Sequence, residues 1–94
     1  MMPVIRGGDW KSLVPIAKEL LEKPELDKIK LKNYDDYLGI FTFNYKGFDI
    51  QVRASNLRIA DKAGLDAKDL LVVRDKRVGK LKRKLKRLWK EARA

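Results

Sequence analysis

Two stretches of the chain space their apolar residues three and four positions apart, which is the pattern of an amphipathic α-helix. The first stretch begins near Ser12, a favourable N-cap, accepts Pro15 in its first turn and stops at Pro24. Its apolar face consists of Leu13, Ile16, Ala17, Leu20 and Leu21. The second stretch follows Asp75, and its stripe consists of Val78, Leu81, Leu85, Leu88 and Ala92, with Trp89 beside it. Both helices need an apolar surface to pack against.

In the segment between the two predicted helices, apolar and polar residues alternate, which predicts β-strands. Residues 28–32 place Ile29 and Leu31 on one face and three lysines on the other. Residues 37–45 and 48–54 predict an antiparallel hairpin joined by a two-residue turn at Lys46-Gly47. This register pairs Tyr45 with Phe48 and puts one apolar face of the hairpin toward the core: Phe41, Phe43, Tyr45, Phe48, Ile50 and Val52.

The segment after the hairpin predicts one more helix and one more strand. With Ser55 as N-cap and Gly64 as terminator, residues 56–63 are expected to form a short helix. The apolar run at residues 70–73 is expected to be a buried strand. The predicted fold is therefore α+β, a small α-β-β-β-α-β-α sandwich with a central antiparallel hairpin and a basic C-terminal helix.

Composition narrows the function classes. The 94 residues fit one small domain, and 45% of them are hydrophobic, which supports a packed core. The chain has no cysteine and no histidine, so disulfides, thiolate metal sites and histidine catalysis are excluded, and no cofactor is expected. The scarcity of amide side chains resembles the composition of thermophile proteins. No apolar stretch approaches the roughly 20 residues of a membrane span and no signal pattern opens the chain, so we expect a cytoplasmic protein.

The charge of the chain is concentrated near its carboxyl end. The formal net charge is +10, from 23 basic and 13 acidic residues. Residues 1–73 carry twelve basic and eleven acidic side chains, whereas residues 74–94 carry eleven and two. We therefore divide the chain into a near-neutral α+β core domain, residues 1–73, and a basic amphipathic C-terminal helix, residues 74–94.

This distribution predicts a protein that binds DNA or RNA phosphates, largely without regard to sequence, through the C-terminal helix. Solvated surface helices normally intersperse glutamates among their lysines, and this one has a single glutamate, Glu91. The predicted phosphate contacts on the helix are Lys76, Arg77, Lys80, Lys82, Arg83, Lys84, Lys86, Arg87, Lys90 and Arg93. Lys30 and Arg53, on the outer face of the predicted sheet, are expected to form a second contact.

Two other hypotheses remain open at this point. In the first, the leucine stripe at residues 78–92 pairs with a second copy of the chain, which would make the protein a homodimer or a protein-interaction module.

The second hypothesis is a nuclease. The predicted order α-β-β-β-α-β, with Asp36 before one strand of the hairpin and Gln51 and Arg53 on the other, resembles the PD-(D/E)XK nuclease core. The resemblance implies that Asp36 and Gln51 hold a divalent metal, that Arg53 takes the place of the catalytic lysine, and that Glu19 or Glu22 assists. Gln51 offers only a neutral oxygen and Arg53 a permanent charge, so the match describes a degenerate site. The sequence therefore favours a binding protein over an enzyme.

Overall fold

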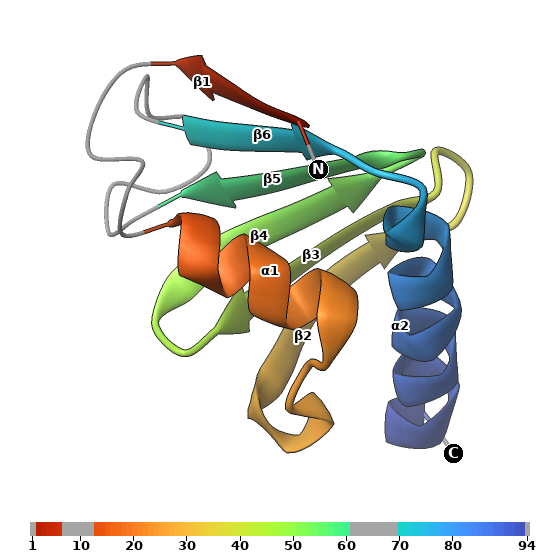
Figure 1. Cartoon of the computed structure of the whole chain (residues 1–94). Coiled ribbons are helices and arrows are strands. Elements are labelled where there is room, and N and C mark those ends of the chain that lie inside the picture. The colour runs from red at the N-terminus through yellow and green to blue at the C-terminus, as the bar shows by residue number, and fades with distance from the viewer. Residues whose placement is uncertain (1, 7–12, 61–69, 94) are drawn as a thin grey trace.

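The computed structural model describes residues 2–6, 13–60 and 70–93, and over these residues the chain forms a six-stranded sheet with helices on one face (Figure 1). The strands are β1 (Met2–Arg6), β2 (Ile29–Asp35), β3 (Ile40–Tyr45), β4 (Phe48–Arg53), β5 (Asn56–Ala60) and β6 (Leu70–Arg74). The helices are α1 (Val14–Glu22), α2 (Arg77–Arg93) and the short 3₁₀-helix η2 (Leu26–Lys28). The predicted α+β class with a C-terminal helix is confirmed.

The sheet has the order β1-β6-β5-β4-β3-β2, and all neighbouring strands run antiparallel. Strands β2 to β6 follow one another as a meander, and β1 adds to the far edge beside β6. Both long helices pack against the same side of this sheet (Figure 1). The opposite side, called the outer face below, is covered by no described helix.

The central hairpin is confirmed in its turn and its register. Tyr45 aligns with Phe48 across the two-residue turn, and both turn residues have positive φ, 52° at Lys46 and 89° at Gly47, as a type I′ turn requires. The predicted inward side chains of the two strands are fully buried except Phe48, which is half-buried. The start of the first strand was predicted too early, because residues 36–39 form a turn in which Asp35 Oδ1 accepts hydrogen bonds from the backbone N–H groups of Tyr37 and Leu38.

Helix α1 matches its prediction closely. Pro15 occupies its first turn, and Leu13, Ala17, Leu20 and Leu21 are buried against the sheet. Leu13 stands at the N-cap position without a capping side chain, and Ser12 lies outside the described residues.

The apolar stripe of α2 belongs to the same hydrophobic core. Val78, Leu81 and Leu85 are at most 2% exposed, and the half-buried Leu88 and Trp89 pack against the core further along the helix. Trp89 also meets Tyr34 of β2 edge to face, with ring centroids 6.0 Å apart. Most of this stripe is therefore already covered by the protein's own sheet.

The predicted helix at residues 56–63 is wrong over its first five residues, which form strand β5. Leu57 and Ile59 alternate with Arg58, so two residues face the core and the arginine faces outward. Ala54 and Ser55 form the tight turn from β4, with Ala54 at φ 48°, and Ser55 is not an N-cap. Residues 61–64 lie outside the described part of the chain. A strand in this place removes the element order on which the nuclease resemblance depended.

Candidate nucleic-acid interface

Helix α2 presents its cationic side chains to solvent because its apolar stripe faces the sheet. The exposed residues, together with Lys76 just before the helix, are Lys76, Lys80, Arg83, Lys86, Arg87 and Lys90. Lys84 is half-buried, and the side chain of Arg93 lies outside the description. Lys84 and the six exposed residues form no ion pair with any residue that the structure describes.

Like charges on α2 repel one another along the helix. Positively charged residues stand three or four positions apart along the helix, as at Arg83, Lys86 and Lys90, and Glu91 is its only acidic residue. Like charges at these spacings destabilise a helix by about 0.2–0.5 kcal/mol per pair. A bound polyanion would remove this penalty and gain attraction from every neighbouring cation.

Arg77 differs from the other predicted contacts because two carboxylates hold its guanidinium. It donates to Asp75 Oδ2 at 2.9 Å and to Glu22 Oε1 of α1 at 3.3 Å, and Asp75 Oδ1 also accepts from the Arg77 backbone N–H at 2.8 Å. These bonds join the start of α2 to the end of α1. Arg77 therefore has a structural role that competes with phosphate binding.

The hydrogen bonds between Arg77 and Asp75 should make the stability of the fold depend on pH. The hydrogen bonds from Arg77 lower the pKa of Asp75 from its ordinary value of 3.8 to about 2. A lowered pKa in the folded state stabilises the protein above the unfolded value, and this stability is lost as the pH falls from 3.8 toward 2. We expect the free energy of unfolding of Asp75→Asn, measured by urea titration, to fall less steeply over this range than that of wild type. Equal slopes for the two proteins would contradict the role of Asp75.

Lys82 lies against the turn between β2 and β3. Its Nζ is 3.4 Å from the position that a Cβ on Gly39 would occupy, and Gly39 has φ 70°. The same turn carries Tyr37, which is 92% exposed. Lys82 is half-buried and is thus less available to a large ligand than its exposed neighbours on α2.

The two sheet residues predicted as a second contact are both exposed on the outer face but do not lie together. Lys30 aligns with Asn44 and, across β3, with Asp49, whereas Arg53 aligns with Ile40 at the other end of these strands. Near Lys30 the charges are mixed, because Lys32 Nζ is 2.9 Å from Asp49 Oδ1 and lowers the pKa of that carboxyl.

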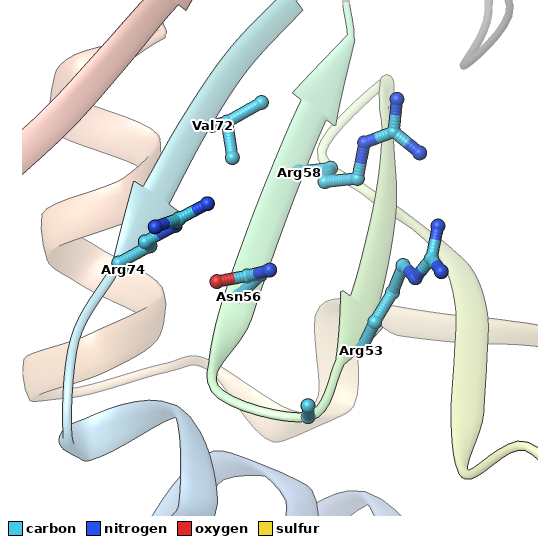
Figure 2. Close-up of a pocket in the computed structure, with 6 residues that line it drawn as sticks. Arg53, Asn56, Arg58, Val72 and Arg74 are labelled. Carbon is cyan, nitrogen blue, oxygen red and sulfur yellow. The ribbon is translucent and has the colours of Figure 1, made fainter.

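Arg53 instead lies beside two arginines that the sequence analysis did not group with it. Figure 2 shows Arg53, Arg58 and Arg74 on the neighbouring strands β4, β5 and β6, with Asn56 between Arg53 and Arg74. A hollow of about 420 Å³ lies among them; we call it the arginine hollow, and its lining residues are Arg53, Ala54, Asn56, Arg58, Val72 and Arg74. Alternation of Leu57, Arg58 and Ile59 was the signal in the sequence that could have placed Arg58 on this face.

The residues of the nuclease hypothesis are not brought together. Asp36 lies in the exposed turn after β2, whereas Gln51 stands in the middle of β4, opposite Thr42, and accepts a hydrogen bond from Arg58. Glu19 and Glu22 belong to α1 on the other side of the sheet, where they pair with Lys46 and Arg77. In the part of the chain that the structure describes, no group of three or more acidic side chains could hold a metal ion.

Neither protein-family models, curated proteins nor solved structures match this chain. Among the residues with described positions, no helix is long and apolar enough to cross a membrane. The two cationic surfaces, on α2 and at the arginine hollow, are therefore the features that point to a function.

Proposed function

We propose that this protein binds DNA or RNA through the phosphate backbone, with α2 as the main contact and little preference for sequence. The observation that carries the proposal is the division of α2 into two sides. One side is buried in the core through Val78, Leu81 and Leu85. Apart from Arg77, the exposed lysines and arginines on the rest of the helix have no carboxylate partners among the described residues. The sheet thus holds the helix in place while its cations face solvent.

The form of this surface favours a long polyanion over a small anion. The 17 residues of α2 extend over about 25 Å, and cations occur along the whole length. Lysine and arginine side chains of this kind contact phosphate oxygens, which carry no information on base identity. Binding should therefore depend on charge and salt much more than on sequence.

Self-association through the leucine stripe has less support. The stripe would have to leave the core to pair with a second copy, since Val78, Leu81 and Leu85 are covered within the chain. Leu88 and Trp89 are only partly exposed.

A salt titration tests the proposed function. Binding of labelled single-stranded and duplex DNA and RNA of mixed sequence, followed by fluorescence anisotropy, should weaken as salt increases. The slope of log affinity against log salt should be about −0.9 for each phosphate neutralised on duplex DNA and about −0.7 on single strands. An oligomer of the same bases on an uncharged backbone is the control and should not bind. Affinity for DNA and RNA that does not change with salt would contradict the proposal.

A further inference from the structure

The arginine hollow gathers three guanidinium groups on one side of the sheet. The register places Asn56 opposite both Arg53 and Arg74, and Arg58 opposite Gln51 and Val72. Neighbouring strands are about 4.8 Å apart, so the three arginines arise from backbone positions within about 10 Å of one another across the sheet. No two of the arginines are directly opposite, but positive charges this close repel one another, and a bound anion would offset that repulsion.

These arginines lack carboxylate partners within the described residues. Arg58 donates to the neutral Gln51 Oε1 at 3.1 Å, and the guanidinium groups of Arg53 and Arg74 have no hydrogen bond or ion pair there. The acidic residue in register with Arg53 is Asp35, which is two strands away and accepts hydrogen bonds from its own turn. The positive charge of the hollow is therefore not compensated by its described surroundings.

The shape and chemistry of the hollow suit a phosphate group within a chain. A planar guanidinium can donate two parallel hydrogen bonds to phosphate oxygens, and three of them can hold one phosphodiester and its neighbour. The residues that line the hollow belong to the sheet and to the turn at Ala54, and no described element covers it (Figure 2). An extended nucleic-acid strand could therefore lie across the hollow. Val72 supplies an apolar contact for a sugar.

The position of the hollow separates it from α2. The arginines alternate along their strands with the buried Val52, Leu57, Ile59 and Val73, which places them on the outer face of the sheet. Helix α2 packs against the opposite face (Figure 1). The exposed side of α2 and the outer face point in different directions, so we expect a straight nucleic-acid segment bound along α2 to leave the hollow unfilled.

We propose that the arginine hollow is a second phosphate-binding site, which takes the backbone of a nucleic-acid segment separate from the one bound at α2. This inference rests on the proposed function. It implies that one chain can hold two segments at once, and so can bridge them.

Stoichiometry with a short ligand tests the inference. A DNA hairpin with a stem of about 10 base pairs, roughly 34 Å long, is too short and stiff to bend around the sheet. Calorimetric titration at low salt should give two hairpins per wild-type chain and one per chain of Arg53→Gln/Arg74→Gln, with the affinity of the remaining site unchanged. Both substituted residues are exposed and unpaired in the described structure, so folding should be preserved.

Matched variants make the result specific. Lys18→Gln/Lys23→Gln removes the same charge at exposed positions away from the hollow and should still bind two hairpins. One hairpin per wild-type chain, or two per chain of the arginine variant, would overturn the second site while leaving the proposed function intact. No binding of this hairpin or of the RNA hairpin of the same sequence would overturn the proposed function itself.

A second measurement, by NMR, distinguishes a nucleic-acid phosphate from a small phosphate anion as the ligand of the hollow. Amide resonances of Asn56 and Val72 should shift when the hairpin is added to wild-type protein. If inorganic pyrophosphate shifts them and the hairpin does not, the hollow is a site for small anions and the inference is overturned.

Discussion

Replacing Arg83, Lys86 and Lys90 by glutamine should weaken binding to duplex DNA by about 100-fold near physiological salt and lower the salt slope by about 2.7, if each contacts one phosphate. All three side chains are exposed on α2, and none has an ion-pair partner within the described residues. Their loss therefore removes attraction to the ligand without breaking a contact inside the protein. Fluorescence anisotropy over a series of salt concentrations measures both quantities.

A control with the same loss of charge separates the role of α2 from that of the net charge. Lys18, Lys23 and Lys28 are exposed lysines outside α2, and their replacement by glutamine also removes three positive charges. We expect this variant to keep most of the wild-type affinity and nearly the full salt slope. If the two variants lose affinity equally, binding depends on total charge and α2 is not the interface.

The elements predicted correctly are those in which one hydrophobic period continues over many residues. The stripe of α2 repeats along the whole helix, and the alternation in β3 and β4 is reinforced by a turn sequence that allows positive φ. The conformation of residues 56–60 was predicted wrongly, because the spacing of Leu57, Ile59 and Ala60 fits a helix and a strand about equally well. Their strand conformation is stabilised by hydrogen bonding to β4 on one side and β6 on the other, which five residues alone cannot reveal.

The candidate site could likewise be predicted where it depends on neighbouring residues in the sequence, but not where it depends on contacts between distant ones. The abundance of cations on α2 can be read from the sequence, but the availability of each depends on its neighbours in space. Arg77 is held by Glu22, which is 55 positions away, and this contact was not predictable from the charge pattern. The arginine hollow likewise exists only because the register of three strands brings Arg53, Arg58 and Arg74 side by side.

Leu85→Ala should lower the free energy of unfolding by about 3 kcal/mol, within the range of 2–5 kcal/mol typical of buried leucines. Leu85 is 0% exposed and lies in the core between the sheet and α2. Against the roughly 5–15 kcal/mol that stabilise a domain, this is a large fraction of the total. Removing residues 76–94 should have a stronger effect still and abolish cooperative unfolding, because Val78 and Leu81 are lost as well. Urea denaturation followed by tryptophan fluorescence and by circular dichroism measures both effects.

The neighbouring substitution Lys86→Ala provides the control, since Lys86 is exposed on the same turn of the helix. It should change the free energy of unfolding by less than about 0.5 kcal/mol, while weakening nucleic-acid binding. If Leu85→Ala is as stable as Lys86→Ala, or if the chain without residues 76–94 still unfolds cooperatively, then α2 is an appendage and its stripe is free for another partner. If Leu85→Ala is much less stable than Lys86→Ala and the truncated chain does not unfold cooperatively, packing in the core fixes the direction in which the cations of α2 point. Any loss of binding in a variant of the apolar stripe must then be corrected for the fraction of protein that is unfolded.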